Sequence, residues 1–418
     1  MAHAAHRARL FRGWWVVGAA LVAQVFGVGP VVVYTIGVFT KPLAQAFASN
    51  RASIALGVSV LDVVITLSAP AVGWLADAYG ARRVIGSGVI GLAACLCALA
   101  FVEPPLWHLY ALFAVAGLAG VATVPVTYSR VVANWFDRQR GLALGVASTG
   151  VGLGAIVTPS LAQFLIARGS WRSAYLGLGV ASLVVAAPVV VAFLRGRPEE
   201  VGLLPDGDSL RPDTKAMDDQ PGLSVREALR TRTLWQLCFI FACLGGCVNA
   251  TMSQLVPFLT DQGVSGRAAA LATSAFGLAS IIGRTGSGYL VDRFFAPRVA
   301  GAMFSGAALG VALLLNGAIG PFAFVASGLL GLAMGAESDV MPFLISRYFG
   351  MRSMAKLLGI AFASYTGGTA LGRFLFTSGF DRTGSYRLSL ACALGVLVVA
   401  ILVTLMLGPY SVEPRGRR

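Results

Sequence analysis

Residues 73–84 read GWLADAYGARRV, and residues 288–299 read GYLVDRFFAPRV. The two stretches share Gly, Leu, Asp, Arg and Val at identical spacing and lie 215 positions apart. Each follows the second apolar run of its half of the chain. Recurrence at equivalent places is typical of an internal duplication. The repeat therefore predicts two related halves.

Twelve apolar runs, each long enough to cross a membrane, surround these two stretches. About 20 apolar residues span the hydrocarbon core, because a helix satisfies its own backbone polar groups. The runs are Trp14–Thr40, Ala52–Ala76, Val84–Val102, Leu106–Phe136, Gly141–Ala167, Ala174–Leu194, Leu234–Thr260, Ala268–Leu290, Val299–Gly317, Phe322–Phe349, Leu357–Phe380 and Leu388–Pro409. We expect an all-α membrane protein with twelve transmembrane helices in two pseudo-symmetric six-helix halves.

One long polar stretch separates the sixth run from the seventh and contains RGRPEE at residues 195–200. We predict an N-terminal six-helix half over 1–194, a cytoplasmic central loop over 195–233 and a C-terminal six-helix half over 234–418. The stretch shows no pattern of a further catalytic or signalling domain.

The composition favours a bilayer over water as the main solvent. The chain is 57% hydrophobic and 12% charged, whereas soluble domains are roughly 45–50% apolar and about 25% charged. The net charge of +14 comes from residues in short loops, without the basic face and interleaved aromatics of a nucleic-acid binder. Most Lys and Arg fall on the side of the termini, which predicts a bacterial inner-membrane, multi-pass protein with both termini cytoplasmic.

Signals of an enzyme are absent from the sequence. The six cysteines lie inside apolar runs, and the three histidines are scattered without metal-ligand spacing. No Gly-rich phosphate loop follows a strand pattern. We predict no enzymatic activity, no metal and no cofactor.

The stretch Gly73 to Arg83 resembles the loop signature of the major facilitator superfamily, Gly-x-x-x-Asp-x-x-Gly-x-Arg-Arg. The resemblance implies the major facilitator fold and a conformational latch. In physical terms Gly73 permits close helix approach, while Asp77 can pair with Arg83 or with a neighbouring helix end. The second copy supplies Gly288, Asp292 and Arg298, but Phe295 replaces the middle glycine, so we expect a weaker latch there.

A second stretch, FDRQRGLALGVASTGVGLG at residues 136–154, resembles the span-five signature of monocarboxylate porters and their bacterial relatives, including the oxalate–formate antiporter group. The signature expects a basic residue where Gln139 stands. The corresponding span-one signature is poorer, because Arg12 precedes Gly13 where an acidic residue is usual. The topology covers the whole chain, whereas the motifs cover only these segments and do not identify the substrate.

Arg284 is the main candidate for binding a substrate. It lies in the eighth run, four residues before Gly288, and an Arg at mid-bilayer costs about 2.5–3.5 kcal/mol even on the mildest scale. The resemblance implies that this arginine holds a carboxylate, for which a guanidinium fork is well suited. The alternative is a structural pair with an acidic helix end. Where the porters have an aspartate one turn earlier this chain has Ser280, and Tyr34 stands near the place of their span-one lysine.

Other polar residues in the runs are further candidates. Arg373 in the eleventh run either provides a second anion contact, which would favour a dicarboxylate or aromatic acid, or pairs with Glu337, Asp339 or Asp381. Tyr34, Tyr128, Asn249 and Tyr365 are candidate substrate contacts, although helix–helix hydrogen bonds explain such residues equally well.

Three acidic residues inside the runs, Asp62, Glu337 and Asp339, are candidates for proton coupling. Burial favours a neutral carboxyl group and a nearby arginine favours a charged one, so a carboxyl that changes partner can load and release a proton. Glu337 and Asp339 lie about 200° apart on a helix, which predicts that only one faces a central site. Asp339 also lies near the helix face of Arg347 and could pair toward it.

These features predict a secondary active transporter, without a nucleotide-driven domain, that moves a small organic anion such as a monocarboxylate by alternating access. Its expected partners are the anion, a proton or counter-anion, and the lipid bilayer, with a monomer as the working unit. One alternative is proton-linked efflux of hydrophobic compounds, and another is a solute sensor that moves nothing.

Overall fold

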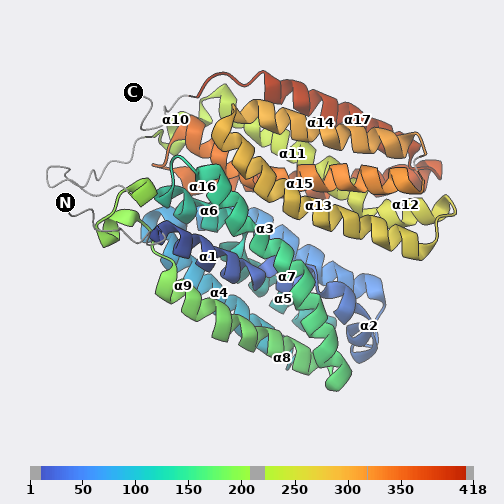
Figure 1. Ribbon diagram of the computed structural model, residues 1–418. Helices are drawn as coiled ribbons and strands as arrows, with labels where there is room; N and C mark the ends of the chain where they lie inside the picture. Colours follow the sequence, from blue (N-terminus) through green and yellow to red (C-terminus); the bar gives the residue numbers. More distant parts are fainter. Residues whose placement is uncertain (1–10, 208–221, 318, 411–418) are drawn as a thin grey trace, which may run out of the picture.

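The computed structural model describes residues 11–207, 222–317 and 319–410. These residues form a bundle of long helices, and Figure 1 shows the helices of the first half in its lower part and those of the second half above them. The start of α1, the short helix α10 and the end of α17 lie at one end of the bundle, which we call the loop end. The opposite end is called the far end.

The first half consists of six rods, three of which are interrupted. Its elements are α1 (Arg12–Val25), η1 (Gly29–Val33), α2 (Ile36–Ala46), α3 (Arg51–Tyr79), α4 (Ala81–Leu99), α5 (Leu106–Gly120), η2 (Val121–Thr123), α6 (Pro125–Trp135), α7 (Arg140–Arg168), α8 (Trp171–Ala181), η3 (Ser182–Ala186) and α9 (Ala187–Phe193). Short turns follow at η4 (Pro198–Val201), η5 (Pro205–Gly207) and α10 (Val225–Leu229).

The second half also consists of six rods, and only the first is interrupted. Its elements are α11 (Arg232–Ser253), α12 (Leu255–Asp261), α13 (Gly266–Arg293), α14 (Ala296–Leu315), α15 (Pro321–Phe349), α16 (Met354–Thr383) and α17 (Arg387–Leu405). Within the described residues the twelve rods match the twelve apolar runs, which confirms the predicted fold class.

Prolines explain the breaks in the rods. Pro30 and Pro125 lie five residues beyond the last residues of α1 and α5, and Pro257 lies four residues beyond the last residue of α11. Because proline has no backbone N–H, it cannot bond to the carbonyl four residues earlier, and the ladder stops there. The first break matters most for the site, because it places Tyr34 just after an irregular turn.

Among the described residues, ten of the rods are apolar enough to cross a membrane by length and composition. The two rods that do not reach this composition are α13 and α16, although they contain 28 and 30 residues. These two helices carry Arg284 and Arg373. They also make the main contacts between the halves, with α16 packed on α3 and α13 packed on α7. Their lower hydropathy therefore reflects a position between the halves rather than a failure to span.

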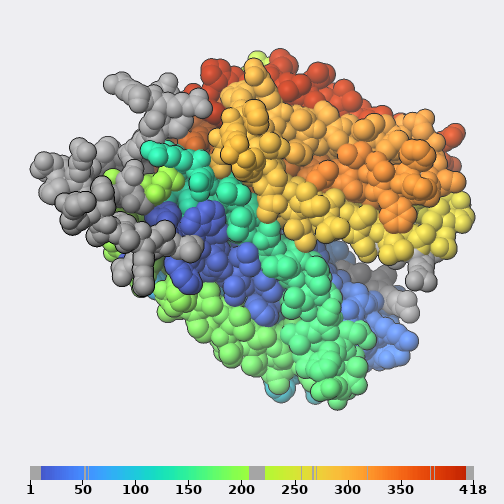
Figure 2. Space-filling view, in the orientation of Figure 1, coloured from blue at the N-terminus to red at the C-terminus, as the bar shows by residue number. Residues whose placement is uncertain are grey.

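The halves meet closely at the loop end and separate toward the far end. Figure 2 shows the surface hollowed between the yellow helices of the second half and the blue and green helices of the first. At the loop end, backbone approaches such as Gly141 to Gly288 leave no room for a side chain, because a Cβ on Gly288 would lie 2.8 Å from the Gly141 carbonyl carbon. The bundle is thus closed at one end only.

Candidate functional site

Arg284 lies where three helices meet, close to the loop-end side of α13. Its backbone is bordered by Gly145 of α7 and Gly335 of α15, whose added Cβ atoms would lie 2.5 Å and 2.9 Å from the Arg284 carbonyl oxygen and amide nitrogen. The residue is 6% exposed. Its Nη1 atom is buried and has no hydrogen-bond partner. Burying a guanidinium nitrogen without a partner costs free energy, so a negative or polar group bound at this position would be stabilising.

Two acidic side chains of α15 lie within electrostatic range of Arg284. Glu337 and Asp339 are 2% and 1% exposed, and within the described residues neither forms a direct ion pair with the arginine. Both carboxylate oxygens of Asp339 are buried without a hydrogen bond. Burying unpaired charges is unfavourable. The three groups therefore form a buried cluster that is incompletely paired.

The two acids face different neighbours around this cluster. Glu337 lies beside Tyr365 of α16, whereas Asp339 lies beside Ser148 of α7. This agrees with their angular separation on the helix. The charge of Arg284 reaches both acids, so the prediction that both cannot face a central cavity squarely stays a prediction.

Polar residues from three further rods complete the site. The Asn249 amide of α11 donates to the Tyr365 hydroxyl over 3.1 Å and to the Gly245 carbonyl over 2.9 Å. Tyr34, which is 44% exposed, lies within electrostatic range of Tyr365. The structure thus brings Tyr34 from the first half together with Asn249 and Tyr365 from the second.

Arg373 and Asp62 lie apart from this cluster and bridge the two halves. An Arg373 Nη1 atom lies 3.8 Å from an Asp62 Oδ2 atom, and the two side chains are 48% and 44% exposed. The predicted pairing of Arg373 with Glu337 or Asp339 is therefore wrong, and the side chain of Asp381 lies outside the described residues. The rods α16 and α3 pack together, which places these two residues opposite each other.

Tyr128 occupies a different environment from the other candidates. It is 1% exposed within a core cluster to which both halves contribute, and its hydroxyl is buried without a hydrogen bond. It takes part in none of the hydrogen bonds of the Arg284 cluster.

The first copy of the repeat joins the two halves at the loop end. Asp77 of α3 pairs with Arg130 of α6 and accepts a hydrogen bond over 3.2 Å from the backbone N–H of Lys356. Lys356 belongs to the first turn of α16, so the carboxylate caps a helix of the other half. The prediction of a neighbouring helix end is confirmed, whereas pairing with Arg83 is wrong.

The second copy makes the reciprocal contact. Asp292 of α13 accepts hydrogen bonds from the backbone N–H groups of Gly141 and Leu142, at 2.7 Å and 2.8 Å, at the start of α7. Asp77 has the additional ion pair with Arg130, whereas Asp292 forms no ion pair within the described residues, and the expected weaker latch at the second copy stays a prediction. Arg298 does not pair with Asp292 but lies over the Phe295 ring, 5.9 Å from its centroid.

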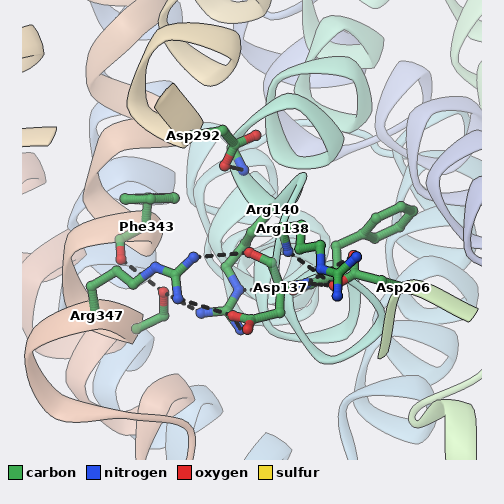
Figure 3. A network of polar contacts seen from close by, with 10 residues as sticks. Asp137, Arg138, Arg140, Asp206, Asp292, Phe343 and Arg347 are labelled. Atoms are coloured by element: carbon green, nitrogen blue, oxygen red, sulfur yellow. Dashed lines mark hydrogen bonds and ion pairs between the residues drawn. The ribbon is translucent and has the colours of Figure 1, made fainter. Parts of the chain in front are cut away.

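A third loop-end contact, missed by the sequence analysis, centres on Asp137 (Figure 3). Its Oδ1 accepts from Arg140 over 3.2 Å and from Arg347 of α15 over 2.9 Å. The backbone N–H of Asp137 in turn donates to Asp206 over 3.2 Å. Arg347 therefore pairs with Asp137, and the predicted approach to Asp339 is wrong. The only sequence signal was the acidic residue within a basic turn, and its partner lies 210 positions away.

Comparison with known proteins places this arrangement in a family. The family model of the Major Facilitator Superfamily matches residues 17–373. Monocarboxylate transporter 11 of Mus musculus is 28% identical over 400 residues, covering 92% of this chain and 86% of that protein. The uncharacterized MFS-type transporter YcxA of Bacillus subtilis is 25% identical over 389 residues, covering 91% of each.

Solved structures show the same fold. A bacterial homologue of the iron transporter ferroportin in an outward-facing state superposes with a TM-score of 0.73 at 15% identity, covering 95% of this chain and 99% of that one. The transporter FucP in the outward conformation has a TM-score of 0.69 at 16% identity, covering 94% and 98%. At these identities the likeness concerns the fold alone. The chain therefore belongs to the major facilitator superfamily, a family of multi-pass membrane transporters rather than enzymes.

Proposed function

We propose that this transporter moves a small organic anion, of the monocarboxylate or a related class, across a bacterial inner membrane. The observation that carries the proposal is Arg284, which is buried between the halves with one guanidinium nitrogen unpaired. A carboxylate can accept two parallel hydrogen bonds from such a group. The names of relatives such as monocarboxylate transporter 11 support the same class of cargo.

In this proposal the solute moves by alternating access, because the contacts between the halves are concentrated at one end of the bundle. The halves, residues 1–194 and 234–418, are locked at the loop end through Asp77, Asp292 and Asp137. The hollow between them opens at the far end (Figure 2). With both termini cytoplasmic, this state is the outward-facing one. Rocking of one half against the other about Arg284 would release the lock and open the loop end. One chain supplies the whole site, so we propose a working monomer.

The coupling ion in this proposal is a proton or a second anion. The related porters have an aspartate where this chain has Ser280. In this proposal Glu337 and Asp339 take over the role of that aspartate, and they approach Arg284 from α15 instead of from α13. An incoming substrate carboxylate would compete with these acids for the arginine. A proton on one acid would then compensate the added negative charge, which links proton and anion movement.

The test is uptake of labelled lactate, succinate and benzoate into proteoliposomes that contain the full chain. We expect Arg284→Gln to abolish uptake of every acid that the wild type takes up, and Arg284→Lys to restore little, because a point charge does not replace the fork. Arg298→Gln is the matched control, since Arg298 is exposed and lies outside the cluster. Wild-type uptake by Arg284→Gln would disprove the anion site.

A further inference from the structure

A groove of about 690 Å³ lies on the outside of the first half, away from the Arg284 cluster. It is formed by the turn between α3 and α4, the first turns of α4, and the end of α9 with the residues that follow. In Figure 1, α4 and α9 lie along the lower edge of the bundle, and the two helices pack on each other. The groove belongs to the loop end, where these elements begin or end.

The mouth of the groove is basic. Arg82 and Arg83 line it, and Glu200 is the one acidic residue of the lining, so positive charge prevails there. Arg82 donates a hydrogen bond to the Val191 carbonyl, which ties the first turn of α4 to α9. Arg83 is exposed and forms no ion pair within the described part of the chain. The Arg82 guanidinium is thus held in place, and the Arg83 guanidinium is available to bind an anion.

The walls of the groove are apolar and continue onto the membrane-facing surface. Val191 is 58% exposed at the groove, and Ile90 of α4 is 51% exposed further along. Gly86 keeps the space between the helices open, since a Cβ there would meet nothing nearer than a Val190 methyl carbon at 4.0 Å. Exposed apolar side chains on a membrane-spanning helix face acyl chains, so the groove runs from a basic mouth into lipid.

Aromatic residues beside the groove mark the level of the membrane interface. Trp74 and Tyr79 lie edge to face at 6.3 Å, and Trp15 stacks on Phe193 at 6.0 Å. All four side chains are exposed, with exposed fractions of 47–60%. Rings of this kind favour the headgroup region of a bilayer. The basic mouth therefore lies at the depth of lipid phosphates.

We propose that this groove binds an anionic glycerophospholipid, with the headgroup phosphate at Arg82 and Arg83 and an acyl chain along Gly86. Guanidinium groups bind phosphate through paired hydrogen bonds, and basic pockets between helices at this level are suited to anionic headgroups. A free phosphate would use the mouth but leave the apolar walls uncovered. The inference does not depend on which solute is transported.

Native mass spectrometry of the full detergent-solubilised chain tests the site, with dioleoyl-phosphatidylglycerol as the probe and dioleoyl-phosphatidylcholine as the reference lipid. We expect tighter binding of the anionic lipid, and a loss of about fivefold on Arg83→Gln, as for one basic residue at a charged membrane surface. Gly86→Leu fills the groove and should remove the tightest lipid while leaving the fold intact. Gly86→Ala is the milder second variant if thermal unfolding shows Gly86→Leu to be unstable.

Two matched controls keep the result specific. Arg298→Gln removes the equivalent arginine of the second repeat, and Gly395→Leu fills open space at a glycine of α17 that has no heavy atom within 4 Å of its added Cβ. Both should bind phosphatidylglycerol as the wild type does. Equal losses in controls and groove variants, or no loss in either, would overturn the proposal. Displacement of the lipid by millimolar inorganic phosphate would overturn it as well, because the site would then recognise a soluble anion.

Discussion

In the proposed function, single charged residues inside the bundle determine what this transporter binds. Arg284 and Glu337 could be selected from the sequence because a charge in an apolar run is costly and needs a function. Their exact partners could not be predicted. Arg373 pairs with Asp62 and Arg347 with Asp137, and each pair joins residues of different halves whose relative placement no local pattern encodes.

Glu337→Gln is predicted to separate anion movement from proton movement. Glutamine keeps the size and hydrogen-bonding capacity of the side chain but cannot carry a proton. We expect loss of accumulation driven by a pH gradient, with exchange of labelled for unlabelled anion retained in the same proteoliposomes. Asp339→Asn is the matched variant, and it identifies the coupling acid if only one substitution has this effect. Unchanged gradient-driven accumulation in both variants would contradict the coupling role.

The bridge between Asp62 and Arg373 is predicted to act as a pair. The side chains are half exposed, so we expect the pair to contribute at most about 1 kcal/mol to stability. Each single charge reversal, Asp62→Arg or Arg373→Asp, should reduce uptake, because two like charges then face each other between α3 and α16. The double reversal should recover most of it. A double-mutant cycle on uptake rates measures this coupling, and additive losses would show that the two residues act independently.

At the scale of helices, the loop end is held by carboxylates that cap helices of the opposite half. Asp77 caps α16 and Asp292 caps α7, so the repeated motif gives a reciprocal lock. The sequence identified both aspartates through their repeat. It could not show that the caps cross between the halves, because the capped backbone N–H groups are distant in sequence. Gly141 lies 151 residues before Asp292, and Lys356 lies 279 residues after Asp77.

Removing a cap is predicted to open the loop end. Loss of an N-cap costs about 0.5–2 kcal/mol, and at the upper end this shifts the conformational equilibrium by roughly 30-fold. We expect Asp292→Ala to increase maleimide labelling of Thr127→Cys, a buried position beside a small void between the halves, in a background without native cysteines. Arg83→Ala, which breaks no ion pair among the residues that the structure describes, is the control. Labelling that stays at the control level would show that the caps do not hold this end closed.

At the scale of the whole molecule, two related halves enclose one charged site and meet tightly at one end. The twelve rods were predictable from the apolar runs of the sequence. The duplication and the family were predictable from the repeated motif. The state of the molecule was not predictable, since it depends on which end of the interface is closed. The helices α13 and α16 connect sequence composition with the arrangement of the halves. Their polar residues lower their hydropathy, and these two helices make the main contacts between the halves.

The central claim is that Arg284 binds the transported carboxylate, and equilibrium binding of labelled lactate and benzoate to the purified full chain tests it most directly. Charge-assisted hydrogen bonds contribute about 1.5–3 kcal/mol, so we predict at least a tenfold loss of affinity in Arg284→Gln and wild-type affinity in Arg298→Gln. Equal affinity in Arg284→Gln and the wild type would contradict the claim.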